Sequence, residues 1–267
     1  MKRMVIALLV LVGLLVAVDF GAAAFAESAV SRQMREQLGL ADDPAVRING
    51  FPFLTQAAAG RYRSVDVSAQ RISVGQLREL EVRAQLRDVR APLSELLGSG
   101  PRTIEVGEAD GTVRIGPRDL ERLIPGVDRL RVENVDADAL EKAVSEGAEP
   151  SLALIDPESA ARLVGTTTVM GEEFEVSVLA VLRIAGGQVE VVPRDVRLGA
   201  DGPSLPSFAQ RALRSLFTLR VDPGRLPLSV TPTELKAVNG ALEVSGETED
   251  LTLGAGSAST TAGAAGR

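Results

Sequence analysis

Residues 80–87 read Leu80-Glu81-Val82-Arg83-Ala84-Gln85-Leu86-Arg87. Aliphatic side chains at every second position alternate with charged or amide side chains, which is the pattern of a β-strand with one buried face and one wet face. A strand of this kind pairs in an antiparallel sheet that packs on one side only. The stretch therefore predicts that a long amphipathic antiparallel sheet forms the framework of the protein.

The same two-residue period recurs before and after this stretch. Further strands are expected at residues 46–49, 65–67, 174–182 and 189–196. Two hairpins are also expected, one joining 104–106 to 113–115 across Asp110-Gly111, and one joining 228–238 to 241–253 around Asn239-Gly240. Asn-Gly and Asp-Gly favour the tight turns that connect antiparallel strands.

Helical periodicity separates these strands. Short helices are expected after Gly116-Pro117 and over residues 138–145, and an amphipathic helix is expected to end near Gly39. The best helix covers 204–217, where apolar side chains recur at intervals of three and four residues. Its stripe includes Leu205, Phe208, Leu213 and Phe217. The stripe packs as an ordinary core helix or helps to close a lipid cavity, so the chain as a whole predicts an α+β fold.

The N-terminal segment has the order of a secretory signal. Lys2 and Arg3 precede an uncharged run of 15 residues, Met4 to Val18, and small residues follow up to Ala26. Because 15 residues are few for a membrane span, cleavage after Ala24 or Ala26 is expected. If the segment is not cut, it becomes a membrane anchor, with Asp19 near the outer interface. Either way the protein is expected to be exported to the periplasm or cell envelope.

Three segments follow from these patterns. Residues 1–26 are the signal or anchor, residues 27–253 form the folded α+β domain, and residues 254–267, rich in Gly, Ala, Ser and Thr, form a disordered tail. Within the folded domain, 86–90 (LRDVR) is echoed by 193–197 (PRDVR). The echo leaves open an arrangement of two similar sheet-plus-helix halves.

Composition excludes several chemistries. The chain has no Cys and no His, so it has no thiol nucleophile, no disulfide, no imidazole base and no His-ligated zinc. A net charge of −7 argues against a nucleic-acid binder. With many carboxylates but no recognisable pair in a cleft, we predict a protein that is not an enzyme and that needs no cofactor and no metal.

Charge is unevenly distributed along the chain. Residues 61–90 contain seven arginines against four acids, whereas residues 105–175 contain 17 acids against seven basic residues. Such blocks form solvated faces, or in an exported protein the basic block can meet anionic lipid headgroups.

The stretch Gly50-Phe51-Pro52-Phe53-Leu54-Thr55 stands out because two aromatic residues flank a proline. Proline cannot donate to a β-ladder, so it suits a strand edge, bulge or bend. The stretch is either a kink that anchors the core or an apolar lip at the mouth of a pocket.

The chain resembles the LmeA-like phospholipid-binding proteins of the actinobacterial cell envelope. The resemblance rests on the signal ending near Val18-Asp19, the helix after it, Gly50 to Gln56, Tyr62 to Val67 and Leu86 to Val89, and it extends to about Leu253. It implies a non-enzymatic lipid binder with a tubular lipid-binding type of fold, in which a long curved antiparallel sheet wraps amphipathic helices around an apolar tunnel. It further implies a role in lipid transport or envelope lipoglycan biogenesis.

A site follows from this reading. An acyl chain in water costs about 0.8 kcal/mol per CH₂, so a continuous apolar lining is needed. The candidate lining residues are Phe51, Pro52, Phe53, Leu54, Leu205, Phe208, Leu213 and Phe217. The candidate headgroup residues are Arg61, Arg63, Arg83 and Arg87, because a guanidinium fork matches phosphate oxygens. The expected partners are a phospholipid or glycolipid and the membrane surface. The alternative is a structural or adaptor domain that binds an envelope protein.

Overall fold

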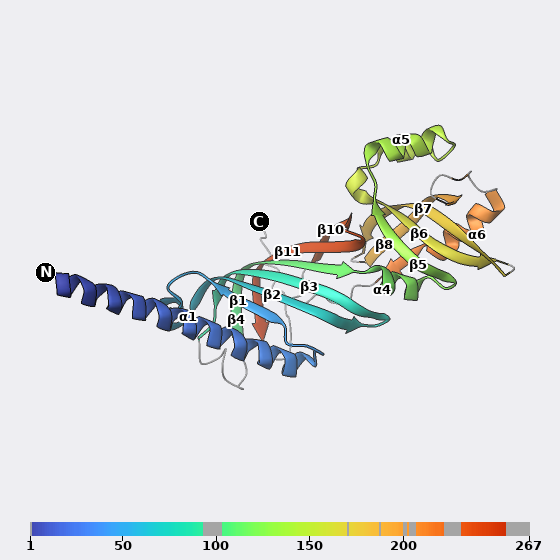
Figure 1. Ribbon diagram of the computed structural model, residues 1–267. Helices are drawn as coiled ribbons and strands as arrows, with labels where there is room; N and C mark the ends of the chain where they lie inside the picture. Colours follow the sequence, from blue (N-terminus) through green and yellow to red (C-terminus); the bar gives the residue numbers. More distant parts are fainter. Residues whose placement is uncertain are drawn as a thin grey trace, which may run out of the picture.

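The computed structural model describes residues 2–92, 103–169, 171–186, 188–199, 202, 207–221 and 231–254. The molecule is elongated, with a long N-terminal helix at one end, one antiparallel sheet in the middle and a second, curled sheet at the other end (Figure 1).

The N-terminal helix α1 runs without a break from Lys2 to Leu38. It therefore contains both the apolar run and the amphipathic helix expected after it, and it ends, as expected, just before Gly39, whose φ is +62°. The side chains before Asp19 are almost all exposed, whereas Asp19 and Ala26 are buried against the body of the protein. The two parts of one helix thus have different surroundings.

The middle sheet, called sheet A, has the order β1-β2-β3-β4-β11-β10 and is antiparallel throughout. Its strands are β1 (Ala45–Asn49), β2 (Arg61–Val74), β3 (Leu77–Arg90), β4 (Thr103–Ile115), β10 (Thr231–Val238) and β11 (Ala241–Gly254). Along β3 the buried side chains of Leu80, Val82 and Leu86 alternate with exposed Arg83 and Arg87. The alternation read from residues 80–87 is confirmed.

One predicted hairpin is wrong and the other is confirmed. β4 passes straight through Asp110-Gly111, because β3 and β11 flank it and offer ladder partners along its whole length. Gly111 lies opposite Ala84 on one side and Gly246 on the other. Around Asn239-Gly240, by contrast, β10 and β11 form the expected hairpin, with φ of +48° and +78° at the two turn residues.

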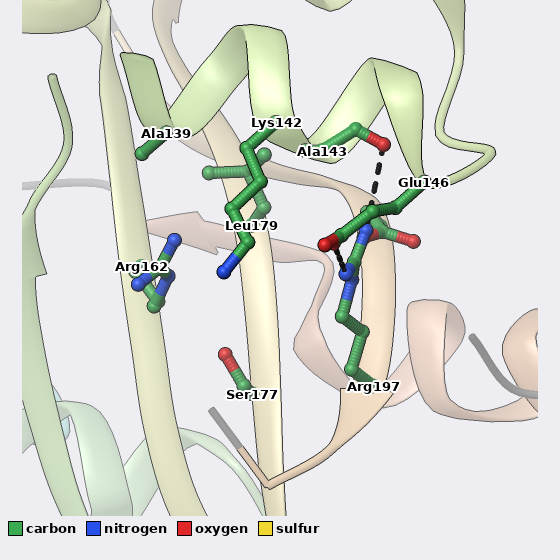
Figure 2. Close-up of a pocket in the computed structure, with 9 residues that line it drawn as sticks. Ala139, Lys142, Ala143, Glu146, Arg162, Ser177, Leu179 and Arg197 are labelled. Carbon is green, nitrogen blue, oxygen red and sulfur yellow. Dashed lines mark hydrogen bonds and ion pairs between the residues drawn. The ribbon is translucent and has the colours of Figure 1, made fainter. Parts of the chain in front are cut away.

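The second sheet, sheet B, has the order β5-β6-β7-β8-β9. Its strands are β5 (Val127–Asn134), β6 (Ala160–Val169), β7 (Glu172–Ala185), β8 (Gln188–Leu198) and β9 (Leu219–Val221). Helix α5 (Ala137–Ser145) lies across its outer face (Figure 2), followed by the short 3₁₀ helices η1 (Pro150–Leu154) and η2 (Pro157–Ser159). Helix α6 (Ser207–Phe217) contacts β8, and α4 (Pro117–Leu123) leads from sheet A into sheet B.

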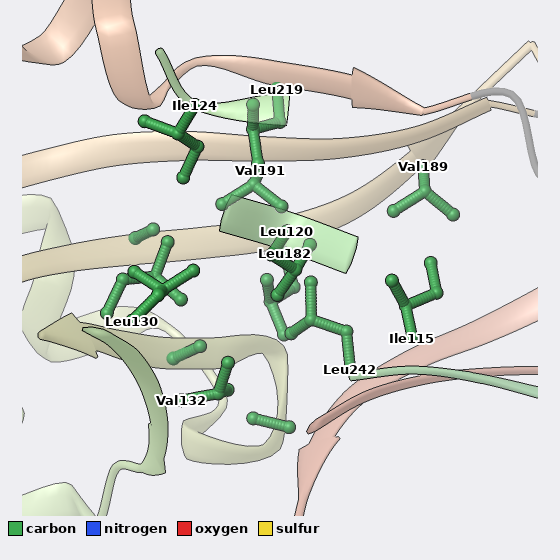
Figure 3. Close-up of a cluster of buried hydrophobic side chains, with 14 of the residues drawn as sticks. Ile115, Leu120, Ile124, Leu130, Val132, Leu182, Val189, Val191, Leu219 and Leu242 are labelled. Atoms are coloured by element: carbon green, nitrogen blue, oxygen red, sulfur yellow. The ribbon is translucent and has the colours of Figure 1, made fainter. Parts of the chain in front are cut away.

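The largest core cluster joins one end of sheet A to the inner face of sheet B (Figure 3). Ile115, Leu120, Ile124, Val191 and Leu242 in this cluster have no exposed surface. We call this end of sheet A the sealed end.

A second cluster lies at the opposite end of sheet A, next to α1 and the short helix α2 (Phe53–Ala59). It consists of Ala26, Ile48, Phe53, Ala57, Tyr62, Leu86, Val89, Val106, Ala109 and Leu251. We call this end the anchor end. A third cluster, which includes Leu140 and Leu152, packs α5 and η1 onto the outer face of sheet B.

The predicted α+β class with long curved antiparallel sheets is confirmed, and it is consistent with a tubular lipid-binding architecture. Residues 255–267, expected to be a disordered tail, lie outside the described part of the chain, as do Leu205 and the first residues of the strand expected from Leu228.

Candidate functional site

Asp19 joins the membrane-type helix to the body of the protein. Its carboxylate accepts hydrogen bonds from the backbone N–H groups of Phe53 and Leu54, both at 2.8 Å. These are orphan N–H groups in the first turn of α2, where Pro52 supplies no side-chain cap. Asp19 is only 5% exposed, so it caps α2 from another helix and adds the charge that a helix N-terminus favours.

Other α1 side chains continue this attachment along the same face. Glu27 accepts a hydrogen bond from the Ile48 N–H at 2.7 Å, and the Ser31 hydroxyl donates to the Pro44 carbonyl. Residues 19, 27 and 31 recur at helical spacing, so one face of α1 is fixed to the strand β1 and to α2. The second half of α1 is therefore part of the folded domain.

The stretch from Gly50 to Leu54 anchors the core, as one of its two interpretations had it, whereas none of its residues lines either cleft at this end. Phe53 is buried beside Tyr62, with ring centroids 6.4 Å apart. Phe51 and Leu54 are 53% and 44% exposed, and the Phe51 ring stacks on Phe20 of α1 at 6.0 Å. The stretch is thus a core anchor with an apolar outer edge, and Pro52 lies at the bend between β1 and α2.

Gly50 explains why this bend needs its particular sequence. Its φ is +109°, which side-chain-bearing residues rarely adopt. The Gln56 amide lies 2.8 Å from where a Cβ would be. That amide donates to the Gly50 carbonyl and accepts from the Arg63 N–H, which ties the bend to β2.

Two adjoining clefts open at the anchor end. The larger, about 480 Å³, is lined by Ala57, Ala58, Ala59, Gly60, Arg90, Ala91, Pro92 and Glu105. The smaller, about 100 Å³, is lined by Arg61, Tyr62, Arg63, Asp88, Val89 and Arg90. The larger one is of the size of ligand pockets, roughly 300–1,000 Å³. Small apolar residues line one part of it and arginine stands where the two clefts meet.

Tyr62 connects the core to the smaller cleft. It is 2% exposed, and its hydroxyl finds no hydrogen-bond partner in the described part of the chain. Burial disfavours the phenolate and raises the pKa of Tyr62 above its ordinary value. A buried hydroxyl without a partner is costly, by roughly 1–3 kcal/mol, so Tyr62 is a candidate donor to a bound headgroup.

The four predicted headgroup arginines divide into two pairs. Arg61 and Arg63 line the smaller cleft, and across the described ranges neither side chain forms an ion pair. Arg87 lies on the outer face of sheet A, where it pairs with Glu108 and with Asp110 at 2.8 Å. The hydrogen bond to Glu108, together with these charges, raises the pKa of Arg87. Arg83 is exposed and lies 3.9 Å from Glu81.

These ion pairs also show how the basic block, residues 61–90, meets the acidic block, residues 105–175, in the folded chain. The basic strand β3 lies next to the acidic strand β4, and Arg87 and Arg90 each meet carboxylates on that strand. Much of the basic block is therefore neutralised by neighbouring carboxylates. Within the described ranges Arg61, Arg63 and Arg78 form no ion pair, and of these Arg61 and Arg63 line a cleft.

The α6 residues of the predicted lining lie elsewhere. Phe217 is 1% exposed and Leu213 half-buried, and both pack in the main cluster beside sheet B. Phe208 lies in the α6 backbone, but its side chain is outside the described part, as is all of Leu205. The structure therefore brings Phe51 to Leu54 together with Arg61 and Arg63, and separates them from α6 (Figure 1).

A third cavity, under α5, has a different character (Figure 2). It measures about 30 Å³ and is lined by Arg162, Ser177, Asp195, Arg197, Glu146, Lys142, Leu179, Ala139 and Ala143. The Arg197 Nε donates to Asp195 at 2.6 Å. A polar space of this size admits a water molecule but no acyl chain. Room for an apolar ligand is therefore found at the anchor end, and the long apolar tunnel stays a prediction.

The long curled antiparallel sheets, with a cleft at the anchor end lined by small apolar residues together with Arg90 and Glu105, give an architecture consistent with the tubular lipid-binding class. A family model described as LmeA-like phospholipid-binding matches residues 17–247, and the chain belongs to this family. The resemblance read from the sequence is confirmed, and the description of the family names phospholipid binding. Neither the curated proteins nor the solved structures contain a match to the chain.

Sequence reasoning missed three contributors to this site. Arg90 joins the two clefts, Tyr62 supplies the unpartnered hydroxyl, and Asp19 holds α2 in place. Asp19 did carry a signal, because it is the one charge between Met4 and Ala26. Arg90 and Tyr62 can be recognised as neighbours only when the register of β2 and β3 is known.

Proposed function

We propose that the protein binds a phospholipid or glycolipid of the cell envelope at the anchor end of sheet A. The acyl portion lies against Ala57 to Gly60 and Ala91-Pro92, and the headgroup lies near Arg61 and Arg63, with Arg90 between them. Tyr62 donates to a headgroup or ester oxygen. The binding supports lipid transport or lipoglycan biogenesis in an exported protein.

One observation carries this proposal: Arg61 and Arg63, which form no ion pair with any described residue, line the cleft that adjoins the one with the alanine lining. The acyl chains of a phospholipid need an apolar surface and its phosphate needs a positive charge. Because only the glycerol region separates the two, these parts of the site must lie close together. A guanidinium fork can bind two phosphate oxygens at once. The family description supports the lipid class.

The N-terminal segment supports export. Helix α1 is long and apolar enough to cross a membrane, and Lys2 and Arg3 at its start favour a cytoplasmic N-terminus. The folded domain would then lie on the outer side, in the periplasm or cell envelope.

The test is the lipid content of the purified full chain. After exchange into a non-lipid detergent, native mass spectrometry should find one phospholipid per chain, which denaturing extraction releases. Ala58, exposed on the wall of the larger cleft, gives a blocking variant, Ala58→Trp, that should lose this lipid. Ala185 is exposed at the end of β7, and Ala185→Trp is the matched control that should keep it. Equal lipid content in the two variants, or none in the natural chain, would refute the site.

A further inference from the structure

We infer that α1 is retained as a membrane anchor and that an apolar rim, formed by Phe20, Phe51 and Leu54, docks on the outer leaflet of the bilayer that α1 spans. The inference deepens the proposed function, because it names the membrane at which the cleft opens. It is carried by contacts that the binding proposal does not use.

The first step is that cleavage would damage the fold. Removal of residues up to Ala24 or Ala26 takes away Asp19 and leaves the N–H groups of Phe53 and Leu54 without their acceptor. Either cleavage also takes away Ala22 and Ala23, and cleavage after Ala26 takes away Ala26 too, all of which pack in the anchor-end cluster. A segment that supplies a buried cap and core side chains belongs to the mature domain.

The second step is the length of the anchor. The exposed apolar run from Met4 to Val18 is 15 residues, which in a helix spans about 22 Å. A bilayer core is about 30 Å thick. Because Asp19 is fixed to α2, no further turn of helix is free to extend the span. Because the apolar helix is shorter than the bilayer core is thick, the folded domain must lie directly on the membrane surface.

The third step is what the body presents at that level. Phe20, Phe51 and Leu54 are 63%, 53% and 44% exposed, and they lie around the attachment point of α1. Phe25, one and a half turns further along α1, is 66% exposed. Large apolar side chains gathered beside a membrane-spanning segment fit the acyl-headgroup boundary of a bilayer. The rim is continuous with the apolar surface of α1, so one lipid phase covers both.

Retention is tested on the full chain, expressed with its own N-terminus in a bacterial host. N-terminal sequencing of the membrane fraction should find the chain beginning at Met1 or Lys2. A mature chain that begins at Phe25 or Glu27 would overturn the inference.

Docking is tested with cysteine labels, since the chain has no native Cys. Phe51→Cys and Leu54→Cys carry an environment-sensitive fluorophore in full chain reconstituted into phosphatidylcholine–phosphatidylglycerol vesicles. Leu154→Cys is the matched control, because Leu154 is 89% exposed and lies on η1 by sheet B. Quenching by aqueous iodide should be several-fold weaker at 51 and 54 than at 154. Equal quenching at all three positions would overturn the docking surface.

The same labels separate this inference from the binding proposal. In the Ala58→Trp background the cleft is blocked but the rim is unchanged. Protection at 51 and 54 should therefore persist there. If a variant loses its bound lipid but positions 51 and 54 stay protected, the docking surface is supported and the change concerns the cleft alone. If protection is lost while the lipid content stays normal, docking is refuted and the binding proposal stands.

Discussion

The two ends of sheet A use the same device for different purposes. At the sealed end, Asp119 of α4 accepts hydrogen bonds from the N–H groups of Arg78 and Glu79, at 2.8 and 2.9 Å. At the anchor end, Asp19 of α1 accepts from two consecutive N–H groups of α2 in the same way. Both carboxylates are buried, and each fixes a helix to a backbone segment that is distant in sequence.

The surroundings of the two aspartates differ. Asp119 also pairs with Arg122, and the core cluster beside it continues from sheet A and α4 into sheet B. Asp19 lies between an exposed apolar helix, an exposed rim and two clefts. A helix attachment inside a closed core contributes to the stability of the fold. A helix attachment next to exposed apolar surface can also contribute to ligand binding. The comparison supports the proposal that lipid binds at the anchor end, while the sealed end supports the fold.

The largest expected effect separates the two ends by stability. Leu120→Ala empties a fully buried site at the sealed end and should lower the free energy of unfolding by about 2–5 kcal/mol. Leu54→Ala at the rim should change it by less than about 0.5 kcal/mol. Urea unfolding in detergent, followed by circular dichroism, measures both. Similar losses in the two variants would abolish the distinction between the ends.

Replacing Asp119 or Asp19 should lower the free energy of unfolding by amounts that differ less than those of the two leucine variants. Asp119→Ala leaves two partly buried N–H groups without their acceptor and should cost roughly 3 kcal/mol. The Arg122 ion pair adds little, because that side chain is 38% exposed. Asp19→Ala removes a helix cap, for about 1–2 kcal/mol. The same unfolding series tests this order, and no loss at all with Asp19→Ala would mean that α1 is not fixed to the body.

The arginine pairs sharpen the comparison through affinity. Arg61→Gln with Arg63→Gln should weaken binding of an anionic phospholipid about tenfold, which corresponds to about 1.4 kcal/mol. Arg83→Gln, on the outer face, should leave binding unchanged. Titration with a short-chain phosphatidylglycerol, followed by calorimetry, compares the two. A larger effect from Arg83→Gln would move the headgroup to the outer face of sheet A.

The smallest expected effect on stability comes from the ionisation of Tyr62, and it can be measured on the natural chain without a substitution. It is the only tyrosine, and the chain has no tryptophan, so the phenolate absorbance reports on this residue alone. Burial raises its pKa, so the folded chain stays protonated at a pH where the unfolded chain ionises, near 10. Its contribution to stability is present below about pH 10 and is lost as the pH rises further. A folded-state titration at or below the ordinary value would contradict its burial.

Much of the fold was predictable because the sheets are amphipathic. The alternation at Leu80 to Arg87 and the turn at Asn239-Gly240 act locally, and the structure has both. The hairpin at Asp110-Gly111 was wrong because a turn signal competes with ladder pairing on both sides of β4, and pairing is not visible in local sequence.

The site was predictable only in part. Phe51 to Leu54 lie at the same end of sheet A as Arg61 and Arg63, because β1, α2 and β2 follow one another along the chain, but they line neither cleft and their role in lining a lipid site stays a prediction. Leu213, Phe217 and Arg83 do not join them, since their placement depends on which sheet α6 packs against and on which face of β3 a residue occupies. Asp19 was interpreted as part of a signal because the N–H groups that donate to its carboxylate, in α2, are more than thirty residues away.

Photo-crosslinking locates the bound lipid most directly. The full chain is loaded with a phospholipid that carries a diazirine in its acyl chain, irradiated, digested and mapped by mass spectrometry. We predict adducts in the peptides that contain Ala57 to Arg63 and Arg90 to Pro92, at the anchor end. Adducts confined to the α6 peptide around Leu213 and Phe217, or no adduct in the folded domain, would contradict the account.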